Sequence, residues 1–228
     1  MAQIKASNFK FLKDLEKHND RDWFTENKKR YQSEHDEIIE FADALLVKMN
    51  DHDLIETPTG KKSLYRIYRD VRFSKDKSPY KTHWAGGFKR ATKHRRGGYF
   101  FHIKPGGQSF IAGGFWAPNK DDLQRIREEI ATDASELRAV IADPTFVSTF
   151  ETLDGEQLKT SPKGFDKEHP DVDLLRYKQF IFSKNFSDEE VLSADFADLA
   201  NKTFKAMRPF FDFMSDVLTT DSNGQPIE

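Results

Sequence analysis

The sequence predicts an α+β fold in which a mostly antiparallel sheet from the middle of the chain packs against N-terminal and C-terminal helices. Three patterns support this class. Apolar residues follow helical spacing up to residue 50, alternate with a period of two between residues 61 and 116, and return to helical spacing between residues 119 and 218. We therefore expect a single α+β domain over residues 1–228, with a helical part at 1–50, the sheet at 61–116 and a mixed, mostly helical part at 119–218.

The first 50 residues predict two helices. Ser7 is a suitable N-cap for a short helix that ends at His18, and a longer helix begins at Asp20 to Asp22 and ends near Asn50. Aromatic and aliphatic residues recur on one face of both helices. The chain contains 21 Phe, 6 Tyr and 3 Trp, so we expect an aromatic-rich core despite a mean hydropathy of -0.75.

A strand is predicted from Ser63 onwards, because the period changes from helical to two. One face of this strand would carry Tyr65, Ile67, Arg69, Val71 and Phe73. Arg69 would then lie on an apolar face, where a guanidinium needs a carboxylate, phosphate or carbonyl partner. Two interpretations remain open: Arg69 pairs with an acidic helix residue, or it lines a polar cavity.

Three further strands are predicted around a hairpin. They span Trp84–Lys89, Gly98–Lys104 and Ser109–Trp116, and the turn at residues 105–108 joins the last two. In the middle strand, one face would carry Tyr99, Phe101 and Ile103 and the other Phe100, His102 and Lys104. We expect His102 to be a half-buried histidine that forms hydrogen bonds.

The remainder of the chain predicts mainly helices. The expected elements, in chain order, are a helix over 120–142, a helical turn over 143–150, an irregular loop over 160–170, a helical turn over 171–177, a strand over 179–183 and a last helix over 194–218. Pro209 is expected to kink the last helix, and the tail from Thr219 is expected to fray.

Composition excludes several classes of chemistry. The chain has no cysteine, so disulfides and thiolate catalysis are excluded. It has no apolar run of roughly 18 residues, and its first residues are charged without an apolar signal region. The common hydrolase, zinc-protease and dinucleotide motifs are missing. We expect a cytoplasmic protein without a membrane partner, a cofactor or a metal.

Positive charge is concentrated in the middle of the chain. Lys61 to Lys104 contains 14 Lys and Arg against 2 acidic residues, a net charge of +12, whereas the whole chain has a net charge of -2. This asymmetry predicts a local attractor for anions. The alternative is a basic face that the acidic helices around it neutralise.

Two polar segments hold the candidate site residues. The candidate ligand-binding residues are Arg66, Arg69, Arg72, Lys77, Tyr80, Lys81, Arg176 and Lys178. If the protein is an enzyme, His169 or His83 is the expected proton carrier, because histidine titrates near neutral pH, and Asp70 or Asp173 would orient it. The HxDxD pattern at His169 to Asp173 could hold a divalent metal, but this spacing is common by chance, so no metal site is predicted.

Several motifs together resemble a widespread microbial family of conserved proteins that is classed as a domain of unknown function. They are FLKDLEKHNDRDWFTENKKRY at residues 11–31, RIYRDVRFSKDKSPYKTH at 66–83, GGFWAP at 113–118 and PKGFDKEHPDVDLLRYKQF at 162–180. The resemblance covers nearly the whole chain. It implies a stand-alone α+β domain, it implies no particular activity, and it marks the segments 66–81 and 162–178 as parts of one family pattern.

Three hypotheses about function follow. The leading one is that the two segments meet and form a pocket that binds or turns over an anionic small molecule bearing phosphate or carboxylate, so that Arg69→Ala and Lys77→Ala would each abolish stabilisation by phosphate analogues. The second is a nucleic-acid-binding module that uses Lys89–Arg96, Tyr99 and Phe100, and whose binding falls steeply with salt. The third is an internal ion-pair network without a ligand, in which Arg69→Ala would cost about 3 to 5 kcal/mol of stability.

Overall fold

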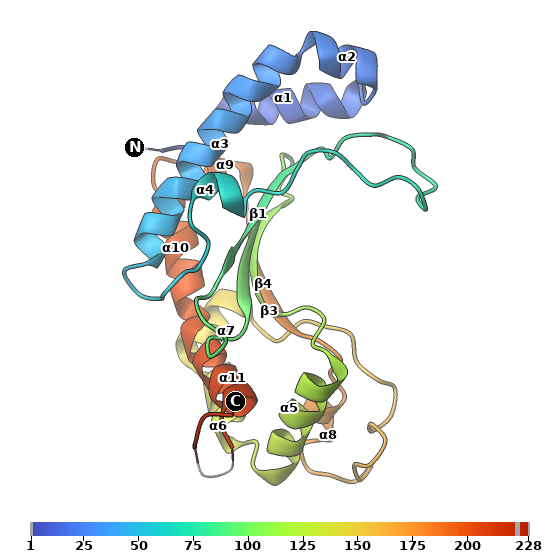
Figure 1. Ribbon diagram of the computed structural model, residues 1–228, viewed down its shortest axis with the longest axis vertical. Coiled ribbons are helices and arrows are strands. Elements are labelled where there is room, and N and C mark those ends of the chain that lie inside the picture. The colour runs from blue at the N-terminus through green and yellow to red at the C-terminus, as the bar shows by residue number, and fades with distance from the viewer. Residues whose placement is uncertain (1, 222–223, 228) are drawn as a thin grey trace. The chain divides into compact units, whose positions relative to one another are not determined.

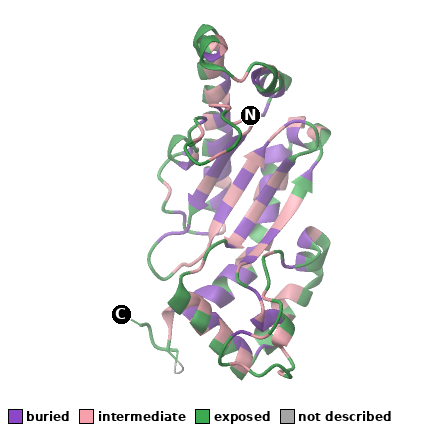
Figure 2. Cartoon of the chain, turned by 90° about the vertical axis from the view of Figure 1, so that its right-hand side faces the viewer, coloured by how far each residue is buried: buried purple, intermediate pink, exposed green. Residues whose placement is uncertain are grey.

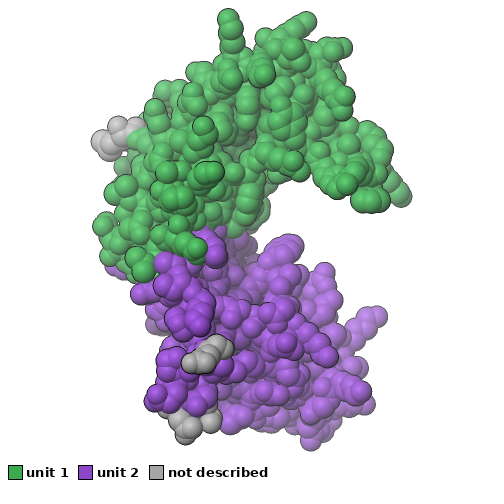
Figure 3. Space-filling view, viewed as in Figure 1, with its two compact units in different colours: residues 1–88, 100–111, 185–202 green, residues 89–99, 112–184, 203–228 purple. Residues whose placement is uncertain are grey.

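A computed structural model describes residues 2–221 and 224–227 of the chain. The chain divides into two compact units, which Figure 3 colours separately: unit 1 comprises residues 1–88, 100–111 and 185–202, and unit 2 comprises residues 89–99, 112–184 and 203–228. Each unit is described by itself below. Among the described residues, no helix is long and apolar enough to cross a membrane.

A four-stranded antiparallel sheet runs through the middle of the chain, in the order β1-β2-β3-β4. Its strands are β1 (Trp84–Lys89), β2 (Gly98–Ile103), β3 (Ser109–Phe115) and β4 (Phe180–Phe186) (Figure 1). Burial alternates along β2 and β3, because successive side chains of a strand face opposite sides of the sheet (Figure 2). Helices from both ends of the chain pack against this sheet, which confirms the predicted fold class.

In unit 1, helices from the start of the chain cover the buried face of the sheet. They are α1 (Ala6–Lys17), α2 (Arg21–Glu26) and α3 (Lys28–Met49). Phe41 of α3 packs against Phe101 of β2, with ring centroids 5.9 Å apart, and Phe11 of α1 stacks on Trp84 of β1. The buried Glu34 of α3 accepts a hydrogen bond of 2.7 Å from the side chain of Asn8, which ties α1 to α3.

The long helix predicted from Asp20 to Asn50 is two helices in the structure. Asp20 is the predicted N-cap, since its side chain accepts from the backbone N–H of Trp23. The helix then breaks at Asn27, whose side chain donates to the carbonyl of Trp23 and ends α2. The first helix begins at Ala6, one residue earlier than the predicted cap at Ser7.

In unit 2, the second half of the chain supplies the helices. They are α5 (Lys120–Thr132), α6 (Ser135–Ala142), α7 (Pro144–Phe150), α8 (Val172–Leu175) and α11 (Arg208–Thr219). Of these, α7 and α11 pack against strand β4 through aromatic rings. The ring of Phe182 in β4 packs edge-on against Phe210 of α11, with centroids 4.9 Å apart. Tyr99 of β2 packs in the same way against Phe211, so an aromatic core forms as predicted.

Two predicted helices are interrupted in the structure. The helix expected over 120–142 is divided between α5 and α6, because Asp133 ends α5 and its side chain accepts from the backbone of Ser135. The last helix is divided into α10 (Phe196–Ala206) and α11, with Pro209 in the first turn of α11. Of the tail predicted to fray, residues 222, 223 and 228 lie outside the described residues, and Thr220 bridges to Pro226.

The strand predicted over 63–73 is wrong. This part of the chain forms α4 (Gly60–Ser63) and then a loop over residues 64–83 that contains only isolated bridges, Leu64 with Gly86 and Tyr68 with Tyr80. The alternation of apolar residues does not mark a buried face here. Ile67 and Phe73 were predicted to share one face, but Ile67 is buried and Phe73 is 96% exposed. We call residues 64–83 the basic loop.

Candidate functional site

The basic loop is fixed to the helices of unit 1 at its base. Asn19, in the turn between α1 and α2, donates to the carbonyl of Tyr80 at 2.9 Å and accepts from its N–H at 3.0 Å. The ring of Tyr80 stacks on Phe24 with centroids 4.0 Å apart. Tyr80, a candidate ligand-binding residue, is buried, and burial raises the pKa of its hydroxyl. These contacts make Tyr80 an anchor of the loop.

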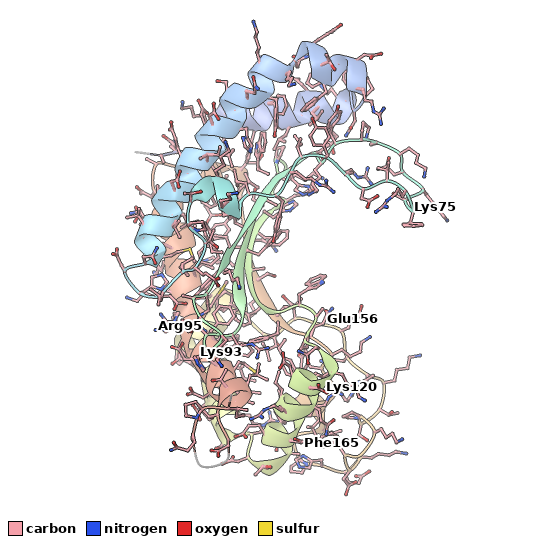
Figure 4. The ribbon with its side chains drawn as sticks, in the orientation of Figure 1. Lys75, Lys93, Arg95, Lys120, Glu156 and Phe165 are labelled. Carbon is pink, nitrogen blue, oxygen red and sulfur yellow. The ribbon has the colours of Figure 1, made fainter. Side chains whose placement is uncertain are left out.

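Backbone hydrogen bonds join the two arms of the basic loop. The N–H of Arg69 donates to the carbonyl of Pro79 at 2.9 Å, and the N–H of Lys81 donates to the carbonyl of Ile67 at 2.7 Å. The tip of the loop lies beyond these bonds, with Lys75 at its end (Figure 4). The arms therefore hold Arg66 and Lys81 near the base of the loop, next to β1.

Arg69 does not lie on an apolar strand face, contrary to the prediction. Its guanidinium donates to Asp76 at 2.5 Å and to the carbonyl of Ser78 at 3.1 Å, and its side chain is 27% exposed. Hydrogen bonds from Ser78 and from Arg69 hold the pKa of Asp76 well below its usual value. The acidic partner comes from the loop itself and not from a helix.

Two other candidate cations are also bonded within the loop. Arg72 forms an ion pair of 2.6 Å with Asp70, and this hydrogen bond lowers the pKa of the Asp70 carboxyl. The ammonium group of Lys77 donates to the carbonyl of Val71 at 2.9 Å. The charged side chains near the tip of the loop thus stabilise the conformation of the loop itself.

Arg66 and Lys81 differ from Arg69 and Arg72 because, within the described residues, they form no ion pair with a carboxylate. The ammonium group of Lys81 donates to the backbone carbonyl of Arg66 at 3.0 Å. Burial and then the nearby charge of Arg66 lower the pKa of Lys81. Neither side chain forms such an ion pair within the described residues, although the charge of Arg66 also helps to lower the pKa of Asp70.

Next to Lys81, two histidines lie against each other. The rings of His83, just before β1, and His102, in β2, have centroids 4.2 Å apart, and both are half-buried. Burial, followed by the charges of neighbouring groups, lowers the pKa of each histidine to about 4. Lys104 contributes to both shifts, and its ammonium group is 3.8 Å from Glu16 of α1. Both imidazoles are therefore neutral at neutral pH.

These side chains form what we call the basic cluster, defined as Arg66, Lys81, His83, His102 and Lys104. A hollow of about 310 Å³ lies beside it in unit 1. The residues that line this hollow are Glu16, Asn19, Arg69, Asp76, Ser78, Tyr80, Lys81, Thr82 and His83. Glu16 and Asp76 have cationic partners, so among the described lining residues Lys81 is the cation that forms no ion pair with a carboxylate. Arg66 is its neighbour outside the lining.

The candidate proton carriers have different surroundings. The ring in contact with His83 is that of His102, whereas Asp70 accepts from Arg72. In unit 2, the Nδ1 atom of His169 accepts from the N–H of Asp171 at 3.1 Å, and its Nε2 atom lies 3.2 Å from the carbonyl of Ala131. Both nitrogens of His169 are thus bonded to the backbone, whereas His83 lines the hollow beside Lys81.

The HxDxD segment is organised around an arginine. Arg138 of α6 donates to Asp171 at 2.6 Å and to Asp173 at 2.7 Å. Among the residues that the structure describes, no three His, Cys, Asp or Glu side chains gather as a metal site. The two carboxylates of this segment therefore serve to hold α8 against α6.

The remaining candidates of the second segment are bonded within unit 2. Arg176 donates to the carbonyl of Leu158 at 2.7 Å, and Lys178 forms an ion pair with Glu156, which Figure 4 labels. Residues 162–178 belong to unit 2 and the basic loop belongs to unit 1. The residues of the basic cluster all belong to unit 1.

The residues assigned to nucleic-acid binding are partly structural. Tyr99 is buried and packs against Phe204 and Phe211, which excludes it from stacking on a base. Arg90 is 1% exposed and donates to Asp212 at 2.6 Å. Lys93 and Arg95 lie on the loop between β1 and β2 (Figure 4). Phe100 is half-buried and lies on the face of β2 opposite to Tyr99.

A hollow of about 500 Å³ in unit 2 is acidic instead of basic. Five carboxylates line it: Glu128, Glu129, Glu136, Asp216 and Asp221. Its arginine, Arg125, donates to the backbone carbonyls of Val217 and Thr220. An anion would be repelled from this hollow, so it does not compete with the basic cluster as an anion site.

The sequence pattern missed three members of this neighbourhood. His102 was expected to be half-buried, which it is, but its ring contacts are with His83 and Phe110. Lys104 was predicted to share a strand face with His102, but neither residue was assigned to the site. Glu16 carried no such pattern, since only the packing of α1 brings it close.

The fold and the site together define an α+β protein with a cluster of basic side chains beside a solvent-accessible hollow. The family model described as "Conserved hypothetical protein (DUF2461)" matches residues 7–213. The chain belongs to this family, which confirms the resemblance of its motifs. Comparison with curated proteins and with solved structures found no match.

Proposed function

We propose that the protein binds an anionic small molecule, one that carries phosphate or carboxylate, at the basic cluster of unit 1. One observation carries this proposal: Lys81 lines the hollow with His83, its ammonium group lies against the backbone of Arg66, and within the described residues neither cation forms an ion pair with a carboxylate. Two like charges repel each other, and an anion between them relieves this repulsion.

The cluster offers suitable donors for an oxyanion. Charge-assisted hydrogen bonds from an ammonium and a guanidinium group are about twice as strong as neutral ones, and a guanidinium matches two oxygens of a phosphate or carboxylate. The imidazoles of His83 and His102 add neutral donors beside them. The hollow of about 310 Å³ leaves space for a small molecule next to Lys81.

Turnover of the bound molecule is a further step that the same residues support. His83 lines the hollow, but its pKa of about 4 makes it a weak base at neutral pH. A bound anion beside the ring would raise this pKa and so make His83 a better proton acceptor. This role falls to His83 more readily than to His169, because both nitrogens of His169 are held by backbone groups.

Thermal unfolding with and without inorganic phosphate tests the proposal. Phosphate at 100 times its Kd should stabilise the protein by about 2.7 kcal/mol, since it binds only the folded chain. Lys81→Met and Arg66→Met should each weaken phosphate binding by about tenfold or more, because each removes a charge-assisted hydrogen bond.

The matched control is Lys62→Met, which removes one exposed charge from α4 in the same unit. It should leave the phosphate shift as it is in the wild-type protein. Equal phosphate shifts in the wild type, Lys81→Met and Arg66→Met would refute the proposal, as would the absence of any shift in the wild type.

A further inference from the structure

A row of aromatic rings lies on the open face of the sheet, beside the basic cluster. Tyr65 of the basic loop stacks against Phe100 of β2 at 6.1 Å between centroids, and Phe100 lies 5.7 Å from Phe110 of β3. Phe110 in turn stacks on His102 at 4.7 Å, with only 13° between the ring planes. We call these four residues, Tyr65, Phe100, His102 and Phe110, the ring platform.

The ring platform is accessible to solvent. Tyr65 is 53% exposed, and Phe100, His102 and Phe110 are half-buried, whereas their neighbours Phe101 and Ile111 are fully buried. Figure 2 shows this alternation along the strands. Large rings on the open face of a sheet expose apolar surface to water, and such surfaces in soluble proteins often bind ligands.

The ring platform and the basic cluster are continuous. They share His102, and the ammonium group of Lys81 lies 5.8 Å from the centroid of the Tyr65 ring. Lys104 directly follows the last residue of β2, and its positive charge lowers the pKa of both histidines. Positive charge therefore borders flat aromatic surface within one unit of the chain.

We propose that the ligand of the basic cluster is a nucleoside phosphate, whose phosphate contacts Arg66 and Lys81 and whose base stacks on the ring platform. This inference rests on the proposed function and names the class of its ligand. A nucleotide combines the two features that the surface complements, a negative group and a flat ring, in one small molecule. A carboxylic acid or sugar phosphate without a ring would leave the platform uncovered.

Calorimetric titration with three probes tests this inference. Inorganic phosphate, ribose 5-phosphate and adenosine 5′-monophosphate share the phosphate group, and only the last carries a base. Adenosine 5′-monophosphate should bind about tenfold more tightly than ribose 5-phosphate, which corresponds to about 1.4 kcal/mol for one stacked base.

Variants of the ring platform should remove only this advantage. In Phe100→Leu, adenosine 5′-monophosphate should bind no more tightly than ribose 5-phosphate, while ribose 5-phosphate binds as it does to the wild type. Tyr65→Leu serves as a second variant, because Tyr65 is more exposed and its loss disturbs the sheet less. Trp116→Leu, which removes a 70% exposed ring of unit 2, is the control and should change neither affinity.

The outcomes separate this inference from the proposed function. If phosphate and ribose 5-phosphate bind but the base adds nothing, the inference is wrong and the anion site stands. If none of the three probes binds, both are wrong. If an eight-nucleotide single strand binds far more tightly than the mononucleotide, with an affinity that falls steeply with salt, the surface binds nucleic-acid strands and the mononucleotide is excluded as its ligand.

Discussion

Two arginines show how strongly a side chain depends on its surroundings. The alternation of residues 63–73 placed a buried guanidinium at Arg69, but Arg69 is 27% exposed and pairs with an aspartate seven residues away. The buried guanidinium belongs to Arg90, which is 1% exposed. Arg90 donates to Asp212, to the hydroxyl of Ser215 at 3.2 Å and to the carbonyl of Arg96 at 2.9 Å.

The two arginines should therefore differ in their effect on stability. Arg90→Met should lower the free energy of unfolding by about 3 kcal/mol, because it leaves the polar partners of a buried charge without a donor. Arg69→Met should lower it by less than about 1 kcal/mol, as expected for a partly exposed pair. Urea unfolding of both variants measures the difference.

Equal losses in the two variants would contradict this distinction. A loss of 3 kcal/mol or more in Arg69→Met would instead support the third hypothesis, in which the charges of the basic loop form an internal network that holds the fold. The ion pairs of Arg69 and Arg72 already account for part of the loop in this way.

At the scale of elements, the hairpin was predictable and the basic loop was not. The strands Trp84–Lys89, Gly98–Ile103 and Ser109–Phe115 agree with their predicted bounds to within one residue. Their alternation reflects burial on one face, and glycines mark the turn between the last two. The basic loop also alternates, but near its tip the carboxylates of Asp70 and Asp76 accept from the backbone N–H groups of Arg72 and Ser78, where a strand would pair with a neighbouring strand.

A glycine in β3 fixes how closely that strand approaches β4. Gly114 has a φ of 126°, and a Cβ atom there would lie 2.1 Å from the carbonyl oxygen of Phe180. Gly114→Ala should therefore cost about 3 kcal/mol or more, since backbone strain adds to a clash with backbone atoms that cannot move aside. Thermal or urea unfolding measures this loss.

Gly107→Ala is the matched control for this substitution. Gly107 also has a positive φ, of 69°, but a Cβ atom there would meet no atom within 4 Å. Its cost should be about 1 kcal/mol, from the backbone conformation alone. If the two substitutions cost the same, the close approach of β3 and β4 does not contribute.

At the scale of the molecule, part of the positive charge of the middle segment is used in ion pairs within the protein. The segment has a net charge of +12, yet Arg69, Arg72, Arg90 and Arg96 all pair with aspartates. At the hollow, the cations without such an ion pair among the described residues are Lys81 and its neighbour Arg66. The attraction for anions predicted from composition is thus confined to a small part of the surface of unit 1.

The two histidines of the basic cluster should make stability depend on pH. Their pKa in the folded protein is about 4, below the usual 6.5, because burial and the charges of Lys81 and Lys104 disfavour the imidazolium, with Glu16, Arg69 and Asp76 as the other charged groups around the hollow. The unfolded chain then binds more protons between pH 4 and 6.5. Stability from this source is complete above pH 6.5 and is lost as the pH falls towards 4.

The measurement is the free energy of unfolding against pH for the wild type and for the double variant with His83→Gln and His102→Gln. The wild type should lose about 1 kcal/mol per histidine relative to the variant, after allowance for solvent screening of these half-buried groups. His94→Gln, at an exposed position, should keep the wild-type slope. Identical slopes in the wild type and the double variant would show that the histidines do not sense pH.

The sequence by itself determined the fold class, the strands of the hairpin region and the family, because these depend on local periodicity, turn residues and motifs. It also located the segment from which the basic cluster comes. Only the tertiary structure decided which charges remain available, since Asn19 and Phe24 anchor the basic loop and α1 brings Glu16 to Lys104. Pairing between residues far apart in the chain depends on distances in space, and spacing along the sequence does not encode them.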